Sequence, residues 1–276
     1  MKQNKEIITS RNNALVKFGA SLGAKKGRDA ARSFIAEGEK LTLEALASHL
    51  PVTHIFVLES RREAVLERLS EYLSDEFFRD TEIILLGEGA FSKISTENSP
   101  QGVISVIKYL DFFRETDIIY NVGFFSEPDE RALILSSVRD PGNVGAVIRS
   151  AAAFGVDHVI LTADSADLYN PKTVRSAMGS LFHVKCTVVS DIVASVRELI
   201  SGGRRVFAAE LSDGARPLSE IDLLPTDIFI IGNEGHGIPK ELSDSCSKSV
   251  YIPISKKTES LNAAVAAAVF MWEQNK

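Results

Sequence analysis

The sequence lacks several features that would assign it to a familiar class of protein. Its two cysteines, Cys186 and Cys246, are too few and too far apart for a disulfide framework or a metal knuckle. No apolar run approaches the roughly 18 residues of a membrane span, and the polar start Met1–Lys5 predicts no signal peptide. The histidines have no metal-ligand spacing. We therefore expect a cytoplasmic protein that needs neither a membrane nor a metal.

Common nucleotide-binding and hydrolase motifs are also missing. The segment Gly19–Gly27 has glycines and lysines but not the P-loop register, and no Gly-x-Gly-x-x-Gly follows the first predicted strand. Gly179-Ser180 lacks the pattern of a nucleophile elbow. These absences count against the familiar classes of α/β enzyme that act on small molecules.

Charge is distributed unevenly along the 276 residues. The net charge is −6, but residues 1–32 carry eight Lys or Arg against two acidic residues, a net of +6, so the rest carries −12. A basic end on an acidic body suits contact with RNA phosphates, although a solvated helix surface would give the same pattern.

The first part of the chain alternates predicted strands and helices, which indicates a small α/β domain. A basic turn is expected at Ala24–Arg28. Helices are predicted at 13–22, 39–49 and 62–73, and strands at 33–38, 54–58, 82–86 and 103–108.

The second part alternates more regularly, and the apolar runs at 132–135 and 228–231 favour strands buried on both faces of a parallel sheet. Ligands bind beyond the carboxyl ends of the strands in such sheets. Strands are predicted at 132–138, 157–162, 204–210, 227–232 and 249–254, and helices at 143–154, 171–178, 191–201 and 258–274.

Three segments of this second part follow predicted strands and form a series. They read Asn-x-Gly-x-x-x-Arg within 143–149, Gly-Asn-Glu-Gly-x-Gly within 232–237, and Ile-Pro followed by Glu-Ser-Leu-Asn within 252–262. In order and spacing they resemble the three motifs of the TrmH/SpoU branch of the SPOUT RNA methyltransferases. That resemblance implies a C-terminal parallel sheet flanked by helices and tied in a deep trefoil knot.

A weaker resemblance covers the first part. Its pattern of Ile-Thr-Ser-x-Asn at 8–12, Phe-x-x-Glu-Gly at 34–38 and Pro-Gln-Gly-Val at 100–103 is similar to the L30e-like substrate-binding domain of many such enzymes. We expect an L30e-like domain at 1–110, a linker or edge element at 111–131 and a SPOUT domain at 132–276.

Two residues of the motifs call for a role on physical grounds. Arg149 stands in a predicted helix of small apolar residues that we expect to be buried, so it should meet a carboxylate such as Glu234 or face a bound anion. Glu234 lies between two glycines after a buried strand, where it is either a turn residue or a carboxylate exposed to a ligand.

The resemblance implies roles for these and other residues. The reaction is methyl transfer from S-adenosylmethionine to a ribose 2′-hydroxyl, with rRNA favoured over tRNA and a homodimer formed through the C-terminal domain. The alternatives are a tRNA methyltransferase and a non-catalytic RNA-binding or ribosome-assembly protein. The implied catalytic residues are Asn143, Arg149, Glu234 and Asn262, the cofactor residues are Glu210, Gly232, Ile252 and Leu261, and the RNA-binding residues are Arg11, Lys25, Lys26, Arg28 and Arg175.

Two stretches depart from the family pattern. Ser255–Lys257 replaces a small glycine-containing turn, which leaves the cofactor contacts of that loop open. Ala263-Ala264 replaces the usual Val-Ser after Leu-Asn and removes a hydroxyl.

Overall fold

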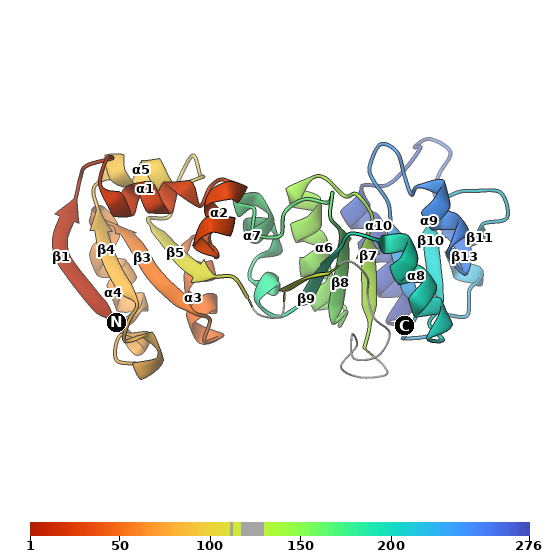
Figure 1. Ribbon diagram of the computed structural model, residues 1–276, viewed down its shortest axis with the longest axis horizontal. Helices are drawn as coiled ribbons and strands as arrows, with labels where there is room; N and C mark the ends of the chain where they lie inside the picture. The colour runs from red at the N-terminus through yellow and green to blue at the C-terminus, as the bar shows by residue number, and fades with distance from the viewer. Residues whose placement is uncertain (111–112, 117–129) are drawn as a thin grey trace. The chain divides into compact units, whose positions relative to one another are not determined.

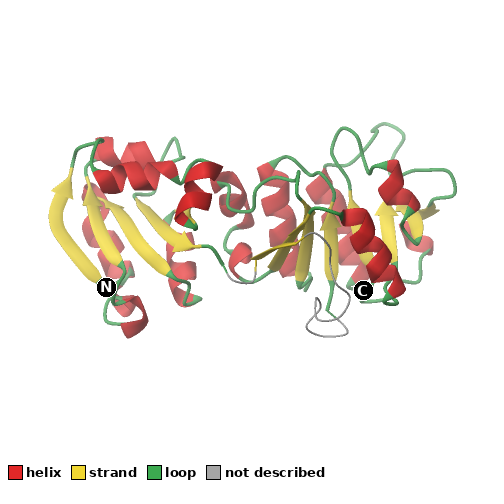
Figure 2. Cartoon of the chain, viewed as in Figure 1, coloured by secondary structure: helices red, strands yellow, loops and turns green. Residues whose placement is uncertain are grey.

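The computed structural model describes residues 1–110, 113–116 and 130–276 (Figures 1 and 2). By their contacts these residues form two compact units. The first unit consists of Met1–Leu110 and Asp167–Phe182, and the second of Asp111–Ala166 and His183–Lys276. Most of the expected linker at 111–131 lies outside the described residues, so that boundary stays a prediction.

The first unit is built on a mixed sheet with the strand order β1-β4-β3-β5-β2, in which β5 runs antiparallel to both β3 and β2. The strands are β1 (Lys2–Ile8), β2 (Ser33–Glu37), β3 (Val52–Leu58), β4 (Glu82–Leu86) and β5 (Val103–Lys108). The helices are α1 (Ala14–Ser21), α2 (Lys25–Ala31), α3 (Glu39–Ala47), α4 (Arg62–Arg68), α5 (Glu88–Ile94) and α7 (Pro171–Ala177). Helices α1 and α5 pack together over a core that includes Phe56 and Phe91.

The structure corrects one local expectation here. The basic turn predicted at Ala24–Arg28 is instead the start of α2. Helix α1 is capped by Asn13, whose side chain accepts a hydrogen bond from the amide of Leu15, so the cap lies at the end of the Ser-x-Asn-Asn stretch.

A segment from the second half of the chain completes the first unit. The ring of Tyr169 stacks on Tyr109 with centroids 4.0 Å apart and lies 4.6 Å from the ring of Phe34. Its hydroxyl accepts a 2.8 Å hydrogen bond from the amide of Leu110. Helix α7, which follows, packs on β2. The segment 167–182 is therefore held by aromatic burial and backbone bonding within this unit.

The described residues of the second unit contain an eight-stranded, fully parallel sheet with the order β11-β13-β10-β12-β7-β8-β9-β6. This confirms the expected parallel sheet. The strands are β6 (Phe113–Thr116), β7 (Ala132–Leu135), β8 (His158–Thr162), β9 (Lys185–Val189), β10 (Val206–Ala209), β11 (Arg216–Pro217), β12 (Ile228–Ile231) and β13 (Lys248–Tyr251).

Helices cover both faces of this sheet (Figure 1). They are α6 (Pro141–Ala153), α8 (Ile192–Ser201), α9 (Lys240–Asp244) and α10 (Ala263–Gln274). Ile228 and Ile230 of β12 join the core under α8 and α9, whereas Phe229 between them contacts Phe270 of α10 at 4.7 Å. Because neighbouring residues of a strand point to opposite faces, α10 lies on the other side of the sheet from α8.

Helix α10 begins at Ala263, five residues later than expected, and packs against α6. Its N-cap is Asn262, whose side-chain oxygen accepts hydrogen bonds from the amides of Ala264 and Val265. The cap explains why a polar residue stands directly before the alanine-rich run. Among the described residues no helix is long and apolar enough to cross a membrane.

Candidate active site

The first motif forms a capped helix start after β7. Asp140 caps α6 by accepting a 2.9 Å hydrogen bond from the amide of Asn143, and Pro141 occupies the first turn, where its missing N–H costs nothing. Asn143 therefore lies in the first turn of the helix, with its side chain left for other partners.

Those partners come from the other two motifs. The Asn143 amide nitrogen donates to Glu234 Oε1 at 2.7 Å, and Asn143 Oδ1 accepts from the amide of Asn262 at 3.0 Å. Three residues that lie after β7, β12 and β13 in the sequence thus form one hydrogen-bonded chain at the carboxyl ends of the strands. Asn262 and Glu234 are exposed and Asn143 is half-buried, so the chain of side chains faces solvent rather than the core.

Arg149 departs from the expectation of burial. Its side chain is exposed, because α6 buries only one stripe, formed by residues such as Val147 and Ile148, and leaves Ala152 and Ala153 in solvent. Within the described part of the chain no carboxylate lies at ion-pair distance from Arg149. Its guanidinium is therefore available to an anion that approaches α6.

The residues assigned to the cofactor lie on the loops after β10, β12 and β13, three neighbours in the sheet. Gly232 begins the loop after β12, and a Cβ there would lie 2.6 Å from the carbonyl carbon of Gly237, so only glycine fits. Ile252 and Leu261 are both half-buried. Glu210 is engaged within the protein, since its carboxylate accepts hydrogen bonds from Ser243 at 2.5 Å and Ser249 at 2.8 Å.

The same loops expose apolar side chains that the sequence did not single out. Leu211, directly after Glu210, is 82% exposed, and Ile254 after β13 is 37% exposed. Isolated exposed apolar residues are common, but two on neighbouring loops at the ligand-binding edge of a parallel sheet offer a contact surface for a flat, partly apolar group.

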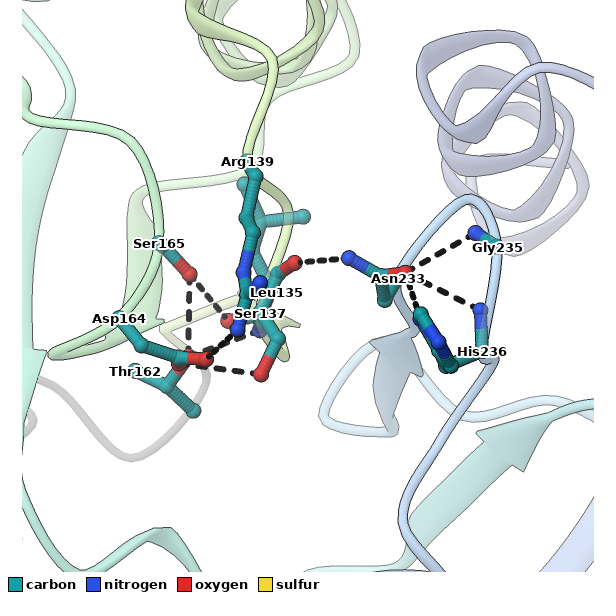
Figure 3. A network of polar contacts seen from close by, with 9 residues as sticks. All are labelled: Leu135, Ser137, Arg139, Thr162, Asp164, Ser165, Asn233, Gly235 and His236. Carbon is teal, nitrogen blue, oxygen red and sulfur yellow. Dashed lines mark hydrogen bonds and ion pairs between the residues drawn. The ribbon is translucent and has the colours of Figure 1, made fainter.

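A network of polar contacts lies beneath the first two motifs (Figure 3). The Asn233 amide nitrogen donates to the carbonyl oxygen of Ser137 at 2.7 Å, and the Ser137 hydroxyl donates to Asp164 at 3.0 Å. Ser137 has φ = 56°, a left-handed conformation that costs a non-glycine residue on the order of 1 to 3 kcal/mol. Burial alone would raise the pKa of Asp164, but hydrogen bonds from Thr162, Ser137 and Arg139 hold that pKa below its ordinary value.

His236 belongs to this network rather than to a catalytic relay. Its backbone amide and its ring Nδ1 both lie within hydrogen-bond distance of Asn233 Oδ1, at 3.0 and 3.2 Å. It is exposed at the turn of the loop.

A groove runs between α6 and α10. It encloses about 400 Å³ and is lined by small or apolar side chains that include Ala146, Ala268 and Trp272. Val265 and Trp272 are each 50% exposed beside it. Exposed large apolar side chains that border one groove mark a surface suited to another protein chain.

The basic residues assigned to RNA are placed differently from one another in the first unit. Arg11, Lys25 and Lys26 are exposed. Arg28 is only 2% exposed, and its guanidinium donates to two backbone carbonyls and, at 2.7 Å, to Asp167. Arg28 therefore acts as a structural cation here, and the charge pattern of the sequence could not separate it from its exposed neighbours.

Arg175 also lies in the first unit, where it forms an ion pair with Glu97. It is half-exposed on α7. No group of His, Cys, Asp and Glu suited to a metal ion occurs among the residues that the structure describes.

Comparison with known proteins agrees with this arrangement. A model of the SpoU rRNA Methylase family matches residues 130–272, and a model of the MRM3-like substrate binding domain matches residues 13–105. The chain is 33% identical over 265 residues to the 23S rRNA (guanosine(2553)-2′-O)-methyltransferase RlmP of Bacillus subtilis, which covers 96% of this chain and 97% of that protein.

Solved structures resemble the whole chain. The AdoMet-bound rRNA methyltransferase from Sinorhizobium meliloti superimposes with a TM-score of 0.78 at 27% identity and covers 98% of this chain and 97% of its own. The SpoU methyltransferase AviRb from Streptomyces viridochromogenes, in complex with AdoMet, gives 0.79 at 25% identity, with 96% and 97% covered. The resemblance inferred from the three motifs is thus confirmed, and the chain belongs to the SpoU rRNA methylase family.

Proposed function

We propose that this protein transfers the methyl group of S-adenosylmethionine to a ribose 2′-hydroxyl of 23S rRNA. The observation that carries the proposal is the hydrogen-bonded chain of Asn143, Glu234 and Asn262, which draws all three motifs to one edge of the sheet. The relatives RlmP and AviRb, named above, support the choice of reaction, and the name of RlmP supports the choice of RNA.

The residues of the site suit an in-line displacement. The bond that forms joins the ribose oxygen to the methyl carbon, the sulfur–methyl bond breaks, and the hydroxyl proton leaves to water or a nearby base. S-adenosylmethionine supplies the electrophilic methyl group when bound. Because the hydroxyl is a weak nucleophile, positioning and stabilisation of the developing alkoxide should contribute most of the rate.

Arg149 suits the second of these tasks. An arginine does not give up its proton in a protein, so it stabilises the alkoxide and grips an adjacent phosphate rather than acting as the base. Asn143 is oriented by Glu234 and Asn262, which use both ends of its amide. The second carboxylate oxygen of Glu234 and the exposed faces of the two amides remain to orient the ribose.

The cofactor residues fit an adenosyl group. Gly232, Ile252 and Leu261 would hold it through the backbone of the loops after β12 and β13, and the exposed side chains of Leu211 and Ile254 would pack on its rings. Glu210 would support this surface indirectly, because its carboxylate ties the end of β10 to α9 and β13.

The exposed cations Arg11, Lys25 and Lys26 are the proposed RNA contacts of the first unit, and Arg175 joins them if RNA displaces its partner Glu97. Phosphate contacts of this kind supply affinity without reading sequence. The protein would act in the cytoplasm, where it meets ribosomal RNA.

We also propose a homodimer that buries the groove between α6 and α10. The exposed side chains of Val265 and Trp272 and the small residues between them allow a second helix pair to approach closely.

The trefoil knot belongs to the same proposal. It is supported by the path of the C-terminal segment, which leaves β13 near one edge of the sheet and returns to Asn143 beyond β12.

The test is transfer of labelled methyl from S-adenosylmethionine to purified rRNA and tRNA by the wild type, Arg149→Ala and Arg197→Ala. Arg197 is a matched control because it is an exposed arginine on α8 of the same unit. Label in alkali-resistant dinucleotides of rRNA, lost only with Arg149→Ala, is the expected result.

Label confined to tRNA would replace the proposed substrate by tRNA. If neither RNA is labelled and S-adenosylmethionine does not bind, the methyltransferase proposal is wrong and an RNA-binding role remains.

A further inference from the structure

We propose that Asn233 is a positioning residue whose amide ties the second-motif loop to the first-motif turn and so fixes Glu234 against Asn143. The inference rests on the proposed function, because Glu234 and Asn143 matter for catalysis only if the site transfers a methyl group. The side-chain nitrogen of Asn233 points toward the carbonyl oxygen of Ser137 in the network of polar contacts (Figure 3).

One half of the tie lies in the loop after β12. Asn233 Oδ1 accepts hydrogen bonds from the backbone amides of Gly235 at 2.9 Å and His236 at 3.0 Å. The backbone of Asn233 also exchanges two hydrogen bonds with that of Gly237, at 2.9 and 3.0 Å. These bonds close the loop on the Asn233 side chain, so Glu234, which lies inside the loop, moves with it.

The other half lies in the turn after β7. The carbonyl oxygen of Ser137 accepts from Asn233 Nδ2 at 2.7 Å, and the Ser137 amide donates to Thr162 Oγ1 at 2.8 Å. The Ser137 hydroxyl and Thr162 Oγ1 both donate to Asp164 Oδ1, at 3.0 and 2.7 Å, while Asp164 Oδ2 accepts from Arg139 at 3.3 Å. Every polar group of Ser137 is therefore bonded, and its left-handed backbone is held in place.

The two halves join three strand ends that are neighbours in the sheet, in the order β12-β7-β8. Glu234 directly follows Asn233, and Asn143 lies six residues beyond Ser137, in the first turn of α6. The 2.7 Å contact between Asn143 and Glu234 therefore depends on the distance between Asn233 and Ser137. Asp164 acts one step further away, because it holds Ser137 and touches neither motif residue.

The decisive variant is Asn233→Asp. It keeps the acceptor for Gly235 and His236 but places an oxygen opposite the carbonyl of Ser137, so that attraction becomes repulsion. Asn275→Asp is the matched control, since it adds the same charge to the same unit and keeps the oxygen that accepts from Arg131. Asp164→Ala removes the support of Ser137, and Asp164→Asn retains an acceptor for the two hydroxyls.

Full-length proteins would be assayed for kcat and for KM with S-adenosylmethionine and rRNA. We expect Asn233→Asp to lower kcat about 10- to 100-fold with less than about a threefold change in either KM, because misplacement of reacting groups by about 1 Å costs that much. Asp164→Ala should lower kcat less than Asn233→Asp does, and Asp164→Asn should restore most of what Asp164→Ala loses. The double variant Asn233→Asp/Asp164→Ala should show a smaller fold loss of kcat than the product of the two single fold losses.

Crystal structures of Asn233→Asp and Asn275→Asp give a readout that needs no activity. We expect the Asn143–Glu234 contact to be broken in the first and kept in the second. The inference is overturned if Asn233→Asp keeps that contact, if its kcat matches that of Asn275→Asp, or if the losses of the double variant multiply. A wild type without rRNA methylation would contradict the proposed function, and the two crystal structures would still decide the positioning role.

Discussion

The ion pair between Arg28 and Asp167 provides the sharpest test of how the first unit is stabilised. The same carboxylate has two cations beside it, Arg28 at 2.7 Å and Lys25 at 3.7 Å. The side chain of Arg28 is 2% exposed and that of Lys25 is 64% exposed. The two pairs share a partner and differ in burial, so they separate the effect of burial from that of charge.

The perturbation is Asp167→Asn, which removes the charge and keeps an oxygen for the amide of Tyr169. Arg28 would then be a buried cation whose remaining partners are the carbonyls of Leu22 and Gly23. Leaving one member of a buried pair uncompensated typically costs about 3 to 5 kcal/mol, and the two carbonyls place this case near 3 kcal/mol. Lys25→Met removes two long ion pairs of an exposed lysine, with Asp167 and with Asp29, and should cost less than about 1 kcal/mol.

The assay is native-state hydrogen exchange of β3 and β5, two paired strands inside the sheet, because the amides of core strands are the last of a unit to open. A loss of about 3 kcal/mol raises the exchange rate roughly a hundredfold, and the loss expected for Lys25→Met raises it by less than about fivefold. Adding Arg28→Met to Asp167→Asn should recover most of the difference, since the unpaired buried charge is gone. Equal exchange rates for Asp167→Asn and Lys25→Met would refute the reasoning.

Three further outcomes follow from the second unit. Val265→Asp places a charge beside the groove and should convert a two-chain species to one chain in light scattering, whereas an unchanged mass would argue against this interface. Asn262→Ala should cost about 1 kcal/mol of helix stability and lower methyl transfer. Asn262→Ser restores the cap but not the bond to Asn143, so its methyl transfer should stay as low as that of Asn262→Ala, and wild-type activity in Asn262→Ser would show that transfer does not need that bond. The pKa of Asp164 is lower in the folded protein than its ordinary value of 3.8, so the charged carboxylate stabilises the fold. The wild type should therefore melt at a higher temperature than Asp164→Ala above pH 3.8, and this difference should disappear as the pH falls through the pKa of the folded state.

The sequence predicted those parts of the fold whose signals are local. The apolar runs at 132–135 and 228–231 became adjacent central strands of a parallel sheet, and β4 and β5 begin and end at the predicted residues. The strands β1 and β9 and the short helix α5 were missed, because β1 is mostly polar, β9 has only five residues and α5 contains a glycine.

The sequence singled out Asn143, Glu234 and Asn262, which the structure brings together, but it did not predict the exposure of Arg149. Arg149 was expected inside the protein because its neighbours are small and apolar, yet small residues also suit an exposed helix face that another chain could cover. Ser137 and Asp164 had no signal in the sequence, since a positive φ and a contact between two strand ends arise only in three dimensions. The burial of Arg28 depends on Asp167, 139 residues away, which no local pattern could reveal.

The inclusion of Asp167–Phe182 in the first unit has a consequence for how the chain is made. The ribosome completes the strands of this unit by residue 110, but the stacking partner of Tyr109 and the counter-ion of Arg28 are added only with residues 167–182. At a synthesis rate of about 5 to 20 residues per second, the nascent unit would lack the stacking partner and the counter-ion for several seconds. We expect chains stalled before residue 167 to be cut readily by protease within residues 1–110, and chains stalled well past 182 to resist it. Equal resistance of the two would show that the unit closes without its last segment.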